Sequence, residues 1–125
     1  MPGSPPPGDA AESLVAKTLE ERGWLLLDRR LRIGRLEVDI VARRGDIVAI
    51  VEVRGRRMDG WVEPLDSLTY DKRKRLARAA RVLWTKRFAN DRTVRLVRID
   101  AAAVTWRDGA PTVEIVEGAI DPQTR

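Results

Sequence analysis

The fold of this chain is decided by residues 36–54, which read LEVDIVARRGDIVAIVEVR. Apolar and other side chains alternate over residues 35–43, whereas residues 47–54 are almost continuously apolar. Alternation with a period of two is typical of a β-strand, and a short apolar run between turn signals is typical of a buried one. Gly45 lies between the two runs, as expected for a turn. We therefore predict two antiparallel strands, with Leu36, Val38 and Ile40 sharing one face of the first.

Further elements follow on both sides of this stretch. Asp9 and Glu12 have the spacing of a helix capping box, and Gly23 is typical of a helix end. The predicted elements are a helix from Asp9, a strand over 24–32, the two strands above, a helix over 66–88 capped by Asp66, a strand over 94–104 and, after a turn at Asp108-Gly109, a short strand over 112–116. The order α-β-β-β-α-β predicts an α/β fold, a single domain with a mixed sheet.

The remaining segments are predicted to carry little structure. Residues 1–8 are rich in Pro and Gly and indicate a disordered tail, so the domain is expected over 9–120, with a loose C-terminal tail over 121–125. We find no apolar run of membrane-spanning length and no signal sequence, and cysteine is absent. The cytoplasm is therefore the expected location.

The composition also limits the chemistry. Histidine and cysteine are both absent, which excludes a Ser-His-Asp triad, a thiolate nucleophile and an ordinary zinc site. A catalytic metal would need oxygen ligands, which favours Mg²⁺ or Mn²⁺. The formal charge of +5 and the pI near 10.4 favour a polyanionic partner.

Two acidic residues, Asp39 and Glu52, lie in the predicted central strands. If these strands are neighbours, the two carboxylates converge, and two like charges about 4 Å apart repel by roughly 4 kcal/mol. A divalent cation between them would remove this conflict. Ion pairs with some of the twenty arginines are the alternative, and the residues alone leave both open. Glu12 is equally open, because the capping box gives it a structural role, and Glu37 either shapes the site or meets an arginine.

The predicted second helix is strongly basic. Between Asp66 and Phe88 it holds eight basic residues against two acidic ones, a larger positive excess than that of the whole chain. Lys74, Arg78 and Arg81 share the face opposite the apolar one. This face is either a solvated surface or one that binds phosphates without sequence preference.

The two strand motifs resemble those of a known family. LEVDIV at residues 36–41 and VEVRGR at residues 51–56 are similar to the GEIDLI and VEVKxR motifs of the bacterial YraN family. The resemblance extends over residues 9–104. That family is assigned to the PD-(D/E)xK nuclease-like superfamily and is similar in element order to archaeal Holliday junction resolvases, which implies a restriction-endonuclease-like fold.

The resemblance implies a metal-dependent endonuclease. It places Glu12, Asp39 and Glu52 as ligands of Mg²⁺ or Mn²⁺, and Arg54 at the position of the family's catalytic lysine. Arg54 would hold the scissile phosphate, or would pair with an acid and displace the metal. Lys72 could take the place of the lysine, and Lys72, Lys74, Arg78 and Arg81 would bind nucleic acid.

The resemblance also implies a substrate class and a possible assembly. The expected substrate is DNA, with branched recombination or repair intermediates foremost, and homodimerisation follows by analogy with the resolvases. The alternatives are a catalytically weak nucleic-acid-binding module with the same fold, and a protein-interaction adaptor. The sequence departs from the family at three positions. It has Leu36 where the family has glycine, Arg30 where the family usually has asparagine, and Arg54 where the family has lysine.

Overall fold

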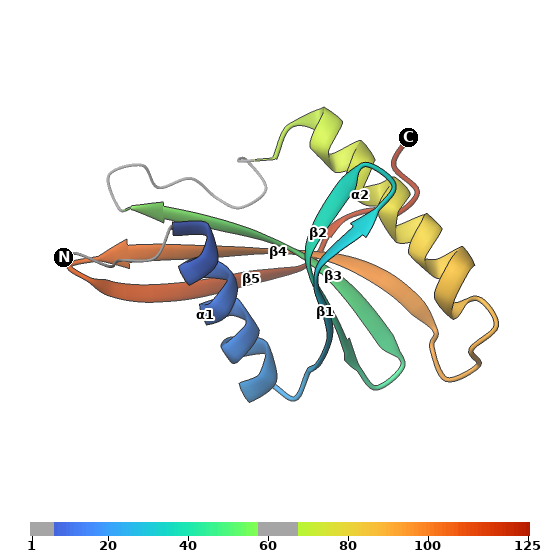
Figure 1. Cartoon of the computed structure of the whole chain (residues 1–125), viewed down its shortest axis with the longest axis horizontal. Coiled ribbons are helices and arrows are strands. Elements are labelled where there is room, and N and C mark those ends of the chain that lie inside the picture. The colour runs from blue at the N-terminus through green and yellow to red at the C-terminus, as the bar shows by residue number, and fades with distance from the viewer. Residues whose placement is uncertain (1–6, 58–67) are drawn as a thin grey trace.

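The computed structural model describes residues 7–57 and 68–125 (Figure 1). Its elements are α1 (Pro7–Glu21), β1 (Leu25–Ile33), β2 (Leu36–Arg44), β3 (Ile47–Arg57), α2 (Tyr70–Leu83), a π-helical turn η2 (Trp84–Phe88), β4 (Leu96–Arg107) and β5 (Ala110–Ile120). This confirms the predicted α/β class and the order α-β-β-β-α-β, and β5 is the strand predicted after the Asp108-Gly109 turn.

The five strands form one mixed sheet in the order β1-β2-β3-β4-β5. β1, β2 and β3 form the predicted antiparallel meander, β4 runs parallel to β3, and β5 is antiparallel to β4. Parallel neighbours need a long crossover, and α2 lies within it. This crossover brings the first turn of α2 to the middle of β3, where the Lys72 Nζ lies 3.6 Å from Glu52 Oε2.

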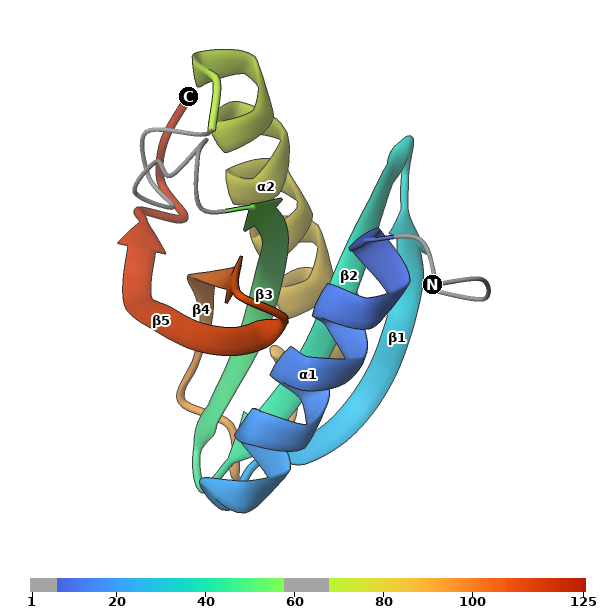
Figure 2. The same ribbon diagram turned by 90° about the vertical axis from the view of Figure 1, so that its left-hand side faces the viewer.

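The two helices cover opposite faces of the sheet (Figure 2). Each helix has its own core cluster, as expected when an amphipathic helix buries one stripe. On one face, α1 buries Ala11, Val15 and Leu19 among Ile40, Val51 and Val104. On the other, α2 buries Leu76, Ala80 and Leu83 among Val41, Ile50 and Ile99. The central strand β3 is therefore covered on both sides, which explains its apolar run.

The predicted starts of both helices need correction. α1 begins at Pro7, so Asp9 lies inside the helix, and proline is favoured at a first helical position because its missing N–H would be unpaired there. α2 begins at Tyr70, where the Oγ1 of Thr69 accepts a hydrogen bond from the Lys72 N–H, 3.2 Å away. Asp66, the predicted cap, lies outside the described residues.

The last strand is also longer than predicted. β5 pairs with β4 from Ala110 to Ile120, whereas the sequence indicated only residues 112–116. The predicted turn is confirmed, because Asp108 (φ 52°) and Gly109 (φ 79°) both adopt the left-handed backbone of a two-residue hairpin. Pairing along the whole length of β4 extends β5 through residues of weak strand preference.

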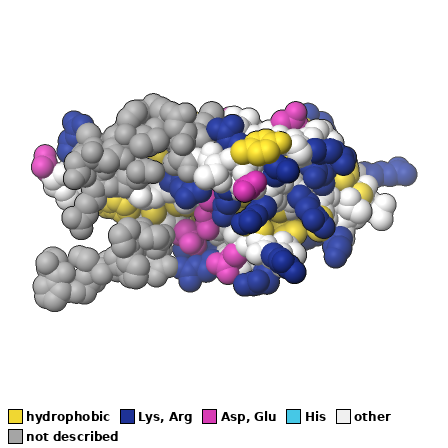
Figure 3. Space-filling view, turned by 90° about the horizontal axis from the view of Figure 1, so that it is seen from above, with side chains coloured by type: hydrophobic (Ala, Val, Ile, Leu, Met, Phe, Trp, Pro, Cys, Tyr) yellow, Lys and Arg dark blue, Asp and Glu magenta, His cyan; other side chains and the backbone are white. Residues whose placement is uncertain are grey.

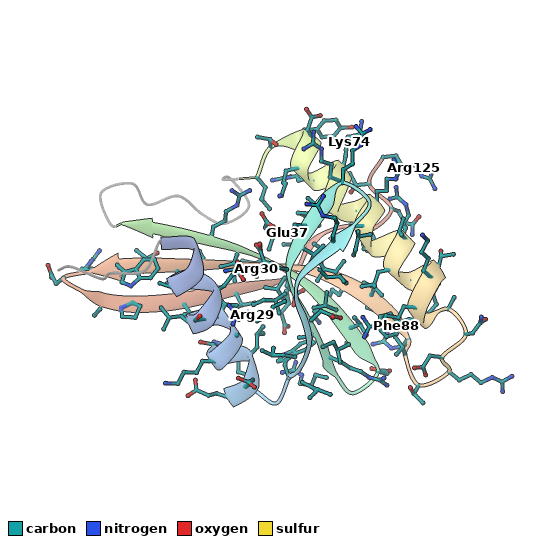
Figure 4. The ribbon with its side chains drawn as sticks, in the orientation of Figure 1. Arg29, Arg30, Glu37, Lys74, Phe88 and Arg125 are labelled. Atoms are coloured by element: carbon teal, nitrogen blue, oxygen red, sulfur yellow. The ribbon has the colours of Figure 1, made fainter. Side chains whose placement is uncertain are left out.

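The C-terminal tail is held on α2 rather than loose. The Arg81 guanidinium donates hydrogen bonds to the carbonyl oxygens of Pro122 and Thr124, and the Tyr70 hydroxyl donates to Arg125 O at 2.9 Å. Figure 4 shows Arg125 beside the N-terminal half of α2. In residues 7–57 and 68–125, no helix combines the length and the apolar character needed to cross a membrane.

Candidate functional site

The candidate site forms where β2 and β3 separate. Their ladder runs from Arg44↔Ile47 to Ile40↔Val51 and stops there, so Asp39 and Glu52 follow directly on the two strands. The Val53 N–H, which continued pairing would direct to β2, donates to Asp39 Oδ2 at 2.8 Å. The carboxylate thus takes the place of a backbone acceptor at the point where the strands diverge.

The alternation of β2 breaks at the same point. Val38 and Val41 both lie in the core cluster under α2, whereas Ile40 lies in the cluster under α1. The prediction that Leu36, Val38 and Ile40 share one face is therefore wrong for Ile40. An irregularity of this kind re-aims a side chain, and strand irregularities gather beside active sites in proteins.

Glu52 is buried and lies beside Asp39. It is 4% exposed, on the face of β3 that α2 covers. Its burial and the neighbouring Asp39 carboxylate, which repels it and hydrogen-bonds to it, raise the pKa of Glu52 to about 7. Lys72 and Arg54 act in the opposite direction, but they do not offset the burial. The predicted convergence of the two acids is thus present in the structure.

Two cations approach Glu52 from different elements. The Arg54 Nη2 lies 3.3 Å from Glu52 Oε2, and the Lys72 Nζ lies 3.6 Å from the same oxygen. Arg54 stands two residues after Glu52 on β3, so both side chains leave the same face of the strand. Lys72 comes from the first turn of α2, which the crossover places above β3. Tertiary structure therefore supplies a lysine beside the acid pair, although the strand itself carries arginine.

Glu12 lies apart from this pair. Its Oε1 accepts from the Arg29 Nη2 at 3.5 Å and from the Arg30 Nε at 3.4 Å, and its side chain is 12% exposed. Both arginines are on β1, beside α1 (Figure 4). Within the described parts of the chain, no three acidic side chains are close enough to share a metal ion. Glu12 as a ligand thus stays a prediction, and in this arrangement it holds two arginines.

The backbone of Arg30 gives a reason for one departure from the family motifs. Its φ is 55°, in the left-handed region that asparagine adopts far more readily than arginine does. The asparagine that Arg30 replaces would therefore fit this backbone with less strain. No property of the sequence around Arg30 signals that conformation, because it arises where β1 pairs with the irregular part of β2.

The predicted nucleic-acid-binding residues differ in their contacts. Lys72 reaches the acid pair, and Arg78 is exposed. Lys74 lies over the Tyr70 ring, 5.2 Å from its centroid, close to Arg125 in Figure 4. Arg81 binds the C-terminal carbonyl oxygens. Lys74, Arg78 and Arg81 line one open hollow beside the C-terminal residues, although two of them already contact other groups. Their role in binding nucleic acid stays a prediction.

One buried acid was not singled out from the sequence. Asp100 on β4 is 1% exposed, and the Arg98 guanidinium donates two hydrogen bonds to it at 2.8 and 3.0 Å. The Gly118 N–H donates a third at 2.9 Å. Because its carboxylate is satisfied by a cation and a backbone donor, Asp100 has a structural role in joining β4 to β5.

The acid pair fits a hard divalent cation. Asp39 and Glu52 supply oxygen donors only, and Mg²⁺ is commonly bound through one or two carboxylates, with water and substrate oxygens completing its shell. Such an ion would also remove the repulsion that contributes to the raised pKa of Glu52. Arg54 and Lys72, already at the site, are suited to the oxygens of a phosphate.

Comparison with known proteins places the chain in a family. The model of the uncharacterised protein family UPF0102 matches residues 11–104. A UPF0102 protein of Sorangium cellulosum is 43% identical over 113 residues, 90% of this chain and 78% of the relative. Relatives in Myxococcus xanthus and Streptomyces coelicolor are 37% and 40% identical, over 91% and 89% of this chain and 88% and 85% of their own length. The chain therefore belongs to UPF0102, the YraN family that its two strand motifs predicted.

Proposed function

We propose that this protein is a divalent-metal-dependent endonuclease that acts on DNA. The observation that carries the proposal is the convergence of Asp39 and Glu52 at the end of the β2–β3 ladder. Burying Glu52 beside a second acid that repels it costs stability, whereas a packed aliphatic side chain at the same place would contribute about 1.5–3 kcal/mol. A function that needs both carboxylates explains why they are there.

The residues of the site have distinct roles in this proposal. Asp39 and Glu52 would hold Mg²⁺ or Mn²⁺, which activates water and neutralises charge on the phosphate. The Val53 N–H fixes the orientation of the Asp39 carboxylate. Lys72 and Arg54 hold the scissile phosphate beside the pair, because both are cations on its rim. Arginine keeps its proton and so stabilises negative charge without acting as a base.

A buried hydrogen-bond donor of Arg54 supports its role as a phosphate ligand. Its Nε is buried and, within the described residues, has no hydrogen-bond acceptor. An unpaired buried donor is costly, and an oxygen atom brought by a ligand would satisfy it. The guanidinium fork can bind phosphate through two parallel hydrogen bonds.

DNA is the proposed substrate on two grounds. The net charge of +5 and the basic α2 favour a polyanion. The YraN motifs also resemble those of the PD-(D/E)xK superfamily, which makes branched recombination or repair intermediates the first substrates to test. A homodimer, by analogy with the resolvases, belongs to the same proposal.

A second candidate is a nucleic-acid-binding module with little or no activity. It is favoured by the contact of Arg54 and Lys72 with the same oxygen of Glu52, since these cations already offset part of the charge that a metal would neutralise. In that case the acid pair is structural, and the basic surface carries the function.

A metal-dependent assay separates the two candidates. Branched, nicked and linear DNA should be incubated with the protein in Mg²⁺, Mn²⁺ or EDTA, with Asp39→Asn as the matched inactive variant. We expect cleavage with either metal and none in EDTA, and saturating metal should raise the melting temperature of the wild type but not of Asp39→Asn. Absence of metal binding by calorimetry at millimolar concentration would rule out the enzyme.

A further inference from the structure

An open groove with a volume of about 760 Å³ lies between the β1–β2 hairpin and α2. The hairpin contributes Leu36 and also Arg35, which forms the two-residue turn with Gly34 (φ 61°). The helix side contributes Arg75, Arg78 and Lys86, with Val82 among them. The groove therefore has a cationic rim on both sides and aliphatic side chains between.

The rim cations differ from several other basic residues of the protein in having no acidic partner among the described residues. Arg43, Arg44, Arg87, Arg95 and Arg98 each form an ion pair with an acidic side chain. In the described part of the chain, Arg35, Arg75, Arg78 and Lys86 have no acidic partner. Figure 3 shows Lys and Arg side chains gathered on the half of the molecule that holds α2, with hydrophobic patches between them. The charge of this groove is thus available for an external anion.

A row of side chains on α2 leads from the groove to the acid pair. Lys72, Arg75, Ala79, Val82 and Lys86 follow one another at spacings of three and four residues, so they lie along one side of the helix. Lys72 contacts Glu52 at one end of this row. With a rise of about 1.5 Å per residue, the row extends for roughly 20 Å, long enough to meet several phosphates of one DNA strand.

The aliphatic side chains distinguish between two forms of DNA. A duplex presents phosphates and sugars outward and keeps the faces of its bases stacked inside, so Leu36 and Val82 would face water beneath it. An unpaired strand can turn its sugars and bases onto the aliphatic side chains while its phosphates meet the rim. We propose that this groove binds a single-stranded DNA segment next to the scissile phosphate, an inference that rests on the proposed nuclease function and assigns its substrate an unpaired arm.

Binding can be measured without cleavage. A fluorescent 12-nucleotide strand should be titrated with the full chain in EDTA, beside a duplex of the same sequence and an abasic strand of the same length. Four phosphate contacts on a single strand predict that affinity falls about 50-fold between 50 and 200 mM salt. The duplex and the abasic strand should each bind at least fivefold more weakly than the ordinary strand.

Paired variants locate the binding surface. Arg75→Gln with Arg78→Gln should lower the salt dependence by about half, since two of four contacts are removed. Lys17→Gln with Arg92→Gln removes the same charge from exposed residues outside the groove and should leave binding near that of the wild type. Val82→Ser should weaken binding of the ordinary strand but not of the abasic one. Unchanged melting temperatures would show that each variant is folded.

The outcomes of these titrations are distinct. Equal effects of the two double variants, or equal binding of the strand, duplex and abasic strand, would overturn the proposal. Groove-dependent strand binding by a protein that cuts nothing would support the groove while refuting the nuclease. Cleavage that is unaffected by the groove variants, together with unchanged binding, would leave the nuclease and refute the groove.

Discussion

The Val53 N–H donates a hydrogen bond to the Asp39 carboxylate across the point where β2 and β3 part, with 2.8 Å between nitrogen and oxygen. This contact lets Asp39 serve two purposes. It satisfies a backbone donor that has left the ladder, and it holds a carboxylate beside Glu52. The structural and chemical roles of Asp39 can therefore be separated by choosing the substitution.

Asp39→Asn and Asp39→Ala should differ in stability. Asparagine keeps an oxygen for the Val53 N–H, whereas alanine leaves this donor unpaired, so the alanine variant should be less stable by about 1–3 kcal/mol. Both lose the metal-dependent rise in melting temperature. Urea denaturation in EDTA measures the difference, with the same pair of substitutions at the exposed neighbour Glu37 as control. Equal stability of the two Asp39 variants would mean that water satisfies Val53 equally well.

Stability should fall as the pH rises toward 7. Burial and Asp39 raise the pKa of Glu52 to about 7, whereas the unfolded chain loses this proton near pH 4.5. Between these values the folded state binds more protons, so the free energy of unfolding decreases with increasing pH. Glu52→Gln should remove this slope and, above pH 7, should be more stable than the wild type by up to roughly 3 kcal/mol.

Denaturation in EDTA at pH 5, 6, 7 and 8 measures this effect, with the exposed Glu20→Gln as control. If the free energy of unfolding has the same pH dependence in the wild type and in Glu52→Gln, the raised pKa of Glu52 is contradicted. Added Mg²⁺ competes with the proton, so its stabilising effect on the wild type should be larger at pH 8 than at pH 6.

Arg54 should be replaceable by lysine but not by alanine. Lysine keeps a cation next to Glu52 and the substrate, so Arg54→Lys should retain metal binding and hold or increase cleavage. Arg54→Ala should reduce cleavage at least tenfold, about 1.4 kcal/mol in the barrier. Single-turnover cleavage measures both variants, and Arg32→Ala, on the exposed part of β1, is the control. Tighter metal binding by Arg54→Ala, in a protein whose wild type cuts nothing, would identify Arg54 as a counter-ion.

Arg30→Asn should stabilise the protein. The φ of 55° at this residue suits asparagine better than arginine, and the ion pair that is lost with Glu12 is half exposed and weak. We expect a gain of about 0.5–1 kcal/mol by urea denaturation. Arg29→Asn removes the other partner of Glu12 at ordinary backbone angles, so it should not stabilise. A loss of stability in Arg30→Asn would show that the ion pair outweighs the backbone strain.

The local pattern was sufficient for much of the fold. The alternation in β2, the apolar run of β3 and the turn at Gly45 identified the meander, because strand period and turn chemistry act between near neighbours. The length of β5 was not predictable, since its outer residues are held by β4 rather than by their own preference. The start of α2 was placed four residues too early because Asp66 and Thr69 are both good caps in sequence.

For the candidate site, the sequence by itself determined the two acids, the basic helix and the absence of histidine and cysteine, and so an oxygen-only site. Only the tertiary structure decided which cations lie beside the two acids. The divergence of β2 from β3 turns Asp39 toward Val53, and the crossover brings Lys72 to Glu52. The packing of α1 beside β1 places Glu12 against Arg29 and Arg30. The tertiary structure also holds Arg81 on the C-terminal residues and places Arg35, which is far away in sequence, across the groove from Arg75 and Arg78. The physical reason is that residue type sets what a side chain can bind, whereas packing between distant segments sets which partner is within a few ångströms.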